Sequence, residues 1–124
     1  ITNYMSILSN YKVKFGLKIF FDTEYEFIDT ISESLDSFIW EANNANRANQ
    51  LLDAINYALA NSDSNITYPA QSMMLAVIKK STTKIYDEMD NYENSNHTPD
   101  FELPTSDFKV IVEAWRDYLI SRGK

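Results

Sequence analysis

The side chains in this sequence that could do chemistry are mainly carboxylates. If the segment from Asp22 to Asp36 is helical, its acids fall on one side of the helix, because they recur every three or four residues. Clustered carboxylates attract cations, so the pattern indicates either a divalent metal ion or a positively charged protein surface. We refer to these five residues as the acidic stripe: Asp22, Glu26, Asp29, Glu33 and Asp36.

The acidic stripe has no basic partner nearby in the sequence. No lysine or arginine lies between Lys18 and Arg47, and a second run without basic residues extends from Ile85 to Phe108. Like charges three or four residues apart destabilise a helix by about 0.2–0.5 kcal/mol per pair. We interpret both runs as candidate surfaces for a cationic partner, and solvated faces without any partner are the alternative.

One tryptophan extends this candidate surface. Trp40 lies to the side of the apolar face of the expected helix, and tryptophan is a frequent anchor in protein interfaces. The second run contributes three acids at a helical spacing. The candidate partner-binding residues are therefore Asp22, Glu26, Asp29, Glu33, Asp36, Trp40, Asp87, Asp90 and Glu93.

Catalytic patterns are scarce in this sequence. The spacing of Asp87, Asp90 and Glu93, or of Glu33 and Asp36, could suit a magnesium or manganese ion in a helical nucleotide hydrolase. The single histidine, His97, has no nucleophile positioned near it in the sequence, there is no cysteine, and two glycines exclude the glycine-rich phosphate loops. We expect no catalytic residue, no metal site and no cofactor, with the metal hydrolase as an alternative.

Composition narrows the class of partner. The 124 residues carry a formal net charge of −7, which disfavours nucleic acid and anionic membranes, since both are bound by basic residues. The longest apolar run, from Met73 to Ile78, is much shorter than the roughly 20 residues needed to span a bilayer. We expect one cytoplasmic domain over 1–124 whose partner is a basic protein, and the sequence leaves its oligomeric state open.

The elements that position these residues follow from periodicity. Residues 1–10 are expected to be a loosely ordered lead-in. Alternation of apolar and polar residues over 11–20 predicts a strand. Apolar residues every three or four positions predict an amphipathic helix over 23–42, capped by Asp22 or Thr23, and a second helix over 47–60.

The second half is expected to be mainly helical. Pro69 suits the first turn of a third helix over 69–91, which the run from Ser81 to Thr83 could break. Thr105 is expected to cap the last helix, with Trp115 on its apolar face. Short extended pieces are expected at 66–68 and 101–103. The predicted fold is mainly α (α+β): a four-helix domain with a small sheet of the 11–20 strand and one or two short strands.

The C-terminal segment resembles small immunity proteins of bacterial polymorphic-toxin and contact-dependent growth inhibition systems. The similar features are the stretch FELPTSDF at 101–108 and the sequence WRDYL at 115–119. An alternating N-terminal strand followed by an acidic helix also fits. The resemblance implies a cytoplasmic protein that binds and blocks a cognate toxin domain, often a basic nuclease, without catalysis. Because such interfaces diverge with the toxin, it assigns no site residue.

We therefore expect a toxin-neutralising immunity protein that covers a basic toxin domain with its acidic surface. The first alternative is a non-inhibitory interaction or assembly module, in which an apolar patch makes the contact and the acids only aid solubility. The second is the magnesium- or manganese-dependent nucleotide hydrolase.

Overall fold

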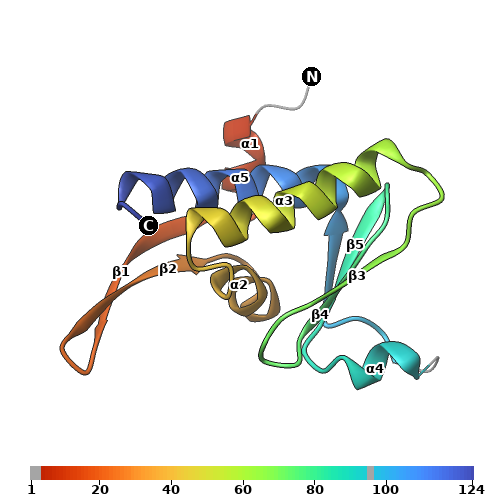
Figure 1. The fold of residues 1–124 in the computed structure, drawn as a ribbon, viewed down its shortest axis with the longest axis horizontal. Helices are drawn as coiled ribbons and strands as arrows, with labels where there is room; N and C mark the ends of the chain where they lie inside the picture. Colours follow the sequence, from red (N-terminus) through yellow and green to blue (C-terminus); the bar gives the residue numbers. More distant parts are fainter. Residues whose placement is uncertain (1–3, 95–96) are drawn as a thin grey trace.

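The chain folds as an α+β protein (Figure 1). The computed structural model describes residues 4–94 and 97–124, and within these ranges there are five helices and six strands. The strands form two antiparallel sheets, one of two strands and one of four. The expected mainly α, four-helix domain with one small sheet is therefore wrong, because one segment expected as a long helix begins with a strand and another forms a hairpin of two strands.

Two long helices supply much of the hydrophobic core. α3 (Ala45–Ala60) and α5 (Thr105–Ser121) lie side by side in Figure 1 and pack against each other. Residues 4–10, expected as loosely ordered, instead form α1 (Tyr4–Asn10), which packs on α5 and buries Ile7. The residues that the two long helices contribute to the main core cluster recur mostly every three or four positions, as an amphipathic helix requires: Ala48, Leu51, Leu52, Ile55 and Ala58, then Phe108, Ile111, Val112, Trp115 and Leu119.

The four-stranded sheet has the order β3–β4–β5–β6 and is antiparallel throughout. Its strands are β3 (Ile66–Pro69), β4 (Leu75–Ile78), β5 (Thr82–Tyr86) and β6 (Phe101–Pro104). One face packs on the helices. The other face forms a second, small cluster of Leu75, Val77 and Tyr86, against which Met89 and Tyr92 pack from the segment that contains α4 (Asp90–Glu93).

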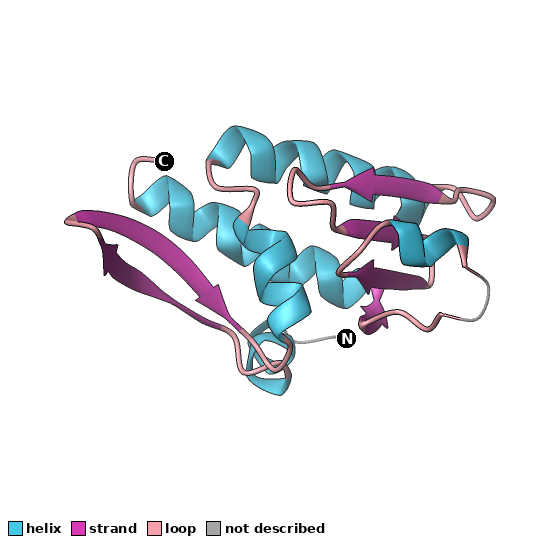
Figure 2. Ribbon diagram, turned by 90° about the horizontal axis from the view of Figure 1, so that it is seen from below, coloured by secondary structure: helices cyan, strands magenta, loops and turns pink. Residues whose placement is uncertain are grey.

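The two-stranded sheet is a hairpin of β1 (Lys14–Phe20) and β2 (Thr23–Asp29). Phe21 and Asp22 form its two-residue turn, and both have positive φ angles, of 50° and 63°. Turns of this kind match the right-handed twist of antiparallel strands. Figure 2 shows the hairpin extending away from the helices at one end of the molecule. Its root packs on α5, where the Phe15 ring lies 5.9 Å from Trp115 between centroids.

The helix expected over 23–42 is wrong in its first half. Residues 23–29 pair with β1, and the helix that follows, α2 (Glu33–Trp40), has eight residues. The N-cap of α2 is Ser32, whose hydroxyl accepts a hydrogen bond from the Leu35 amide. The expected caps, Asp22 and Thr23, lie at the turn of the hairpin instead. Thr23, Tyr25 and Phe27 have side chains that favour strands, and they alternate with period two. Hydrogen bonding of this segment to the adjacent β1 therefore overrides its helical pattern.

The helix expected over 69–91 is also wrong, because this segment contains the hairpin of β4 and β5. Every residue of β4 is buried, since both faces of the sheet are covered there. A strand buried on both faces has a continuous apolar sequence, which periodicity cannot distinguish from a buried helix. The polar run from Ser81 to Thr83, expected only as a weak point in a helix, leads into the second strand of this hairpin.

Other elements follow the expectations closely. The strand over 11–20, the helix over 47–60 and the extended pieces at 66–68 and 101–103 correspond to β1, α3, β3 and β6. α5 begins at Thr105 and buries Trp115 completely, although Pro104 and not Thr105 is its N-cap residue. Among the described residues, no helix is long and apolar enough to cross a membrane.

We predict that the hydroxyl of Thr105 stabilises the junction of β5, β6 and α5. This hydroxyl donates to the Lys79 carbonyl at 2.5 Å and lies 2.9 Å from the buried hydroxyl of Thr83. Thr105→Val should lower the free energy of unfolding by about 1–3 kcal/mol, because it leaves buried polar groups without a partner. In urea denaturation, Thr83→Val combined with Thr105→Val should lose less than the sum of the single losses. Additive losses would contradict a shared hydrogen-bond network.

Candidate functional site

An open groove lies between the β1–β2 hairpin and α2. Its volume is about 1360 Å³. At the end away from the hairpin, Arg47 from α3 and the turn residues Gln71 and Ser72 line it. We call it the hairpin groove. One face of α2 and its C-cap residue line it: Glu33, Asp36, Ser37, Trp40 and Glu41.

Apolar side chains along the hairpin groove are unusually exposed. Ile19 is 73% exposed, Phe20 64%, Tyr25 43% and Trp40 41%. The indole N–H of Trp40 donates to the Glu26 carbonyl at 3.0 Å, which joins α2 to the outer edge of β2. Contiguous exposed apolar surface with polar residues around it is typical of protein interaction sites.

Three acids gather at the α2 side of the groove. Asp29 ends β2, while Glu33 and Asp36 lie at the beginning of α2. Across residues 4–94 and 97–124, none of the three forms a salt bridge. The positive end of the α2 dipole partly offsets their repulsion. The fold therefore places three carboxylates without a basic partner beside the exposed aromatic side chains.

Asp36 is the most constrained of these acids. Its Oδ1 atom is buried and has no hydrogen-bond partner in the described part of the chain. Burial raises the pKa of Asp36 above its ordinary value, the charges of Asp29 and Glu33 raise it further, and hydrogen bonding to Thr30 opposes the shift. A positive charge entering the groove would stabilise the ionised form of this side chain.

Glu26 has a different role. Its side chain is 9% exposed, and Arg122 Nε lies 3.4 Å and Lys124 Nζ 3.9 Å from its carboxylate oxygens. Glu24 lies 3.9 Å from the Arg122 guanidinium. These ion pairs join β2 to the C-terminal end of α5. Glu26 is therefore neutralised within the molecule and is unsuited to the partner-binding role predicted for it.

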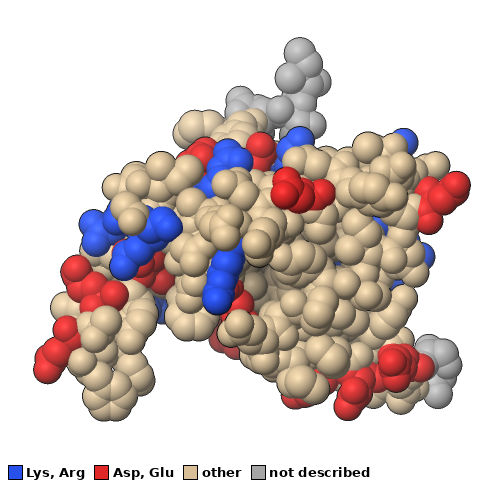
Figure 3. Space-filling model, viewed as in Figure 1, with Lys and Arg blue, Asp and Glu red and all other residues tan. Residues whose placement is uncertain are grey.

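The predicted site residues do not form one surface. Asp22 is exposed in the hairpin turn, away from the cluster of Asp29, Glu33 and Asp36. Asp87, Asp90 and Glu93 are exposed near α4. Figure 3 shows the acidic side chains of the hairpin and those near α4 at opposite ends of the molecule. The five-residue acidic stripe along one helix is wrong, because its first three members precede α2.

The possible metal ligands are not assembled either. Within the described ranges, no group of three or more carboxylate or histidine side chains is placed to hold a metal ion. Asp87 follows β5, while Asp90 and Glu93 belong to the four-residue α4, so they do not share the long helix expected for them.

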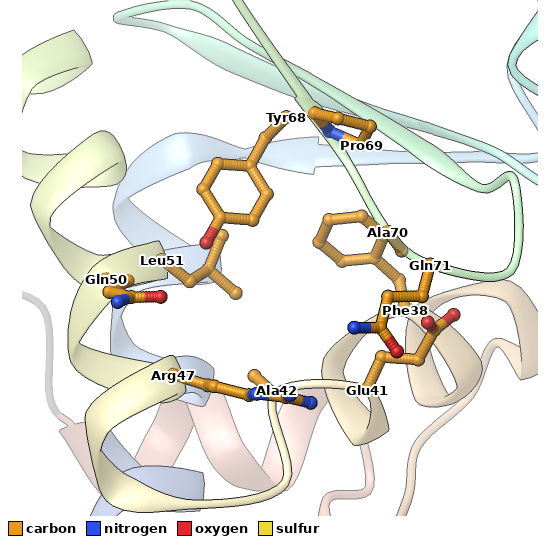
Figure 4. Close-up of a pocket in the computed structure, with 10 residues that line it drawn as sticks. All are labelled: Phe38, Glu41, Ala42, Arg47, Gln50, Leu51, Tyr68, Pro69, Ala70 and Gln71. Carbon is orange, nitrogen blue, oxygen red and sulfur yellow. The ribbon is translucent and has the colours of Figure 1, made fainter.

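A smaller pocket adjoins the hairpin groove. It has a volume of about 160 Å³ and shares Glu41, Arg47 and Gln71 with the groove. Figure 4 shows the polar side chains of Arg47, Glu41 and Gln71 around one side of this pocket. Its apolar lining comes from α2, the connection after it, α3 and the β3 region: Phe38, Ala42, Leu51, Tyr68, Pro69 and Ala70.

The apolar half of the site is absent from the set of binding residues predicted from the sequence. Ile19, Phe20 and Tyr25 were not among the predicted binding residues. The alternation of Thr23, Tyr25 and Phe27, directly after an alternating strand, is the signal that could have found the hairpin. The small pocket has no such signal, because residues from three separate segments form it.

We predict that Asp36→Asn stabilises the protein at about pH 7. Because the pKa of Asp36 is raised in the folded state, the folded state binds more protons than the unfolded state above the ordinary value of 3.8. Stability therefore falls as the pH rises through this window, and removing the charge should restore at most about 1 kcal/mol, since solvent screens a partly exposed group.

Thermal unfolding of Asp36→Asn and wild type from pH 3 to pH 7 would measure this effect. The difference in stability should grow with pH. Asp22→Asn is the matched control, because Asn tolerates the positive φ of that exposed turn position. A difference for Asp36→Asn that stays constant over the whole pH range would contradict the raised pKa.

Comparisons with known proteins assign no relative to this chain. No protein-family model matches it, and neither the curated proteins nor the solved structures searched give a match. The geometry of the hairpin groove is therefore the basis for inferring a function.

Proposed function

We propose that this protein is a cytoplasmic immunity-type inhibitor that binds a cognate basic toxin domain through the hairpin groove and blocks it without catalysis. A nuclease is the favoured kind of toxin, because enzymes that bind nucleic acid carry basic surfaces. The groove would cover such a surface with carboxylates and aromatic side chains.

The observation that carries this proposal is the cluster of Asp29, Glu33 and Asp36 next to exposed Tyr25 and Trp40. Acids that form no salt bridge within the molecule attract a cationic protein and accelerate encounter. Aromatic side chains beside them provide apolar contact area, and their rings can also contact lysine or arginine side chains. Charge and apolar surface thus occur together in one concave site.

The acids near α4 have a lesser role in this proposal. Asp87, Asp90 and Glu93 are exposed but lie apart from the hairpin groove. Their charge adds to the overall negative field, which is screened over roughly 8–10 Å at physiological salt. They would contribute to long-range attraction and not to the contact itself.

A second candidate function is a non-inhibitory assembly module. The observation in its favour is the hairpin tip, where Ile19, Phe20 and Phe21 are 73%, 64% and 88% exposed. In this case an apolar contact would dominate, and association would depend little on salt.

We predict that reversing the charges at Asp29→Lys and Glu33→Lys slows association with the toxin. The partner to use is a basic toxin domain encoded next to this chain's gene or one that copurifies with the protein. The association rate at low ionic strength should fall by about tenfold or more, because steering charges act mainly on this rate. Stopped-flow measurements at about 50 and 300 mM salt would show the effect and its screening.

The matched control is Asp87→Lys with Asp90→Lys, which changes the net charge equally at the other end of the molecule. It should slow association less. If both double variants slow association equally, only net charge matters and the groove is not the binding site. If salt and all four reversals have no effect but Phe20→Ser weakens binding, the assembly module is favoured.

A further inference from the structure

The small pocket and the hairpin groove form one continuous site. Glu41, Arg47 and Gln71 line both cavities, so the pocket opens at the end of the groove. The pocket, with about 160 Å³, is well below the roughly 300–1,000 Å³ of sites for whole small-molecule ligands. Its size suits one side chain, and its lining of Phe38, Leu51, Tyr68 and Ala70 suits an apolar one.

The charge along this site is uneven. Asp29 ends β2, and Glu33 and Asp36 lie in the first half of α2, whereas the pocket lies at the C-terminal end of α2, near Glu41. Of the two basic residues that line the groove, Lys18 lies over the Phe27 ring at 4.4 Å, and Arg47 lies at the pocket end. The end of the groove with the three acids is therefore complementary to a cation, and the other end to an apolar group.

The distance between the two ends can be expressed in residues of a partner chain. Asp36 lies in α2, and Glu41 is the residue directly after it, five positions further on. At the rise of an α-helix, this separation is about 7.5 Å along the helix axis. An extended chain advances about 3.3 Å per residue, so two or three residues span this distance.

We propose that the hairpin groove binds an extended segment of a partner protein in which a lysine or arginine contacts Asp29, Glu33 and Asp36 and an apolar side chain, two or three residues away, enters the small pocket. This inference rests on the proposed function, because it specifies the segment by which a cationic partner is recognised. The basic side chain lies beside Trp40, and the apolar side chain is enclosed by Phe38 and Tyr68.

Synthetic peptides test this recognition without the natural partner. The first carries two arginines and, two residues later, one leucine in a serine background. The second has serine in place of the leucine, and the third has glutamine in place of both arginines. Each sequence is also made in reverse order, because the groove does not fix the chain direction.

Binding is measured by ¹⁵N NMR titration, with Trp40 fluorescence as a second readout, since Trp115 is fully buried. The peptide with arginine and leucine, in one of its two orders, should bind about tenfold more tightly than either substituted peptide. Its resonance shifts should include Asp36, Trp40, Leu51 and Tyr68.

Two variants locate the apolar contact. Ala70→Leu fills the small pocket, and Gln71→Trp covers its mouth from an exposed position that does not disturb the core. Each should make the leucine and serine peptides bind equally while the preference for arginine remains. Asp29→Asn with Asp36→Asn should have the opposite effect and abolish only the preference for arginine.

The outcomes separate this inference from the proposed function. If the leucine and serine peptides bind the wild type equally, the pocket is not an anchor and the inference is overturned, while a cationic docking site stands. If the glutamine peptide binds as well as the arginine peptide, the inference and the recognition of cations at the groove both fail. If no peptide binds, the inference is overturned, and the kinetics with the toxin domain decide the proposed function separately.

Discussion

The burial of Trp115 is the interaction on which the arrangement of this molecule depends. Its indole is completely buried in α5 and donates a hydrogen bond to the Ala42 carbonyl at 2.8 Å. Its ring also packs near Phe15 at the root of the hairpin. One side chain thereby joins α5, the connection between α2 and α3, and β1. Because the hairpin and α2 are the two walls of the groove, this contact fixes the distance between them.

The hairpin is stabilised mainly at its root, and its outer part is exposed. The ion pairs of Glu26 with Arg122 and Lys124 attach the middle of β2 to the end of α5. Beyond this point Ile19 and Phe20 are largely exposed, and within the described part of the chain no third strand pairs with either edge. A two-stranded hairpin is only marginally stable alone. An exposed apolar tip of this kind adds nothing to the core, which is consistent with a surface kept available for contact.

The sequence predicts that acidic residues are concentrated in this region, but not how the fold arranges them. The excess of acids and the lack of basic residues between Lys18 and Arg47 are properties of the sequence. Their assignment to one helix is wrong, yet Asp29, Glu33 and Asp36 still meet, because the end of β2 leads directly into α2. Glu26 could not be recognised as internally paired, since its partners Arg122 and Lys124 lie about a hundred residues away in the chain.

Elements with an unambiguous pattern can be predicted from the residues alone: the alternating β1, and the amphipathic helices α3 and α5 with Trp115 on the buried face. That 23–29, 75–78 and 82–86 are strands depends on their tertiary contacts. Tyr25 and Phe27 alternate within a segment that also carries helical spacing from Ile28 to Leu35, and β4 is apolar at every position. For such segments local preference is nearly balanced, so pairing with a neighbouring strand and burial against the core determine the conformation. The hairpin groove exists because residues 23–29 pair with β1 and do not continue α2.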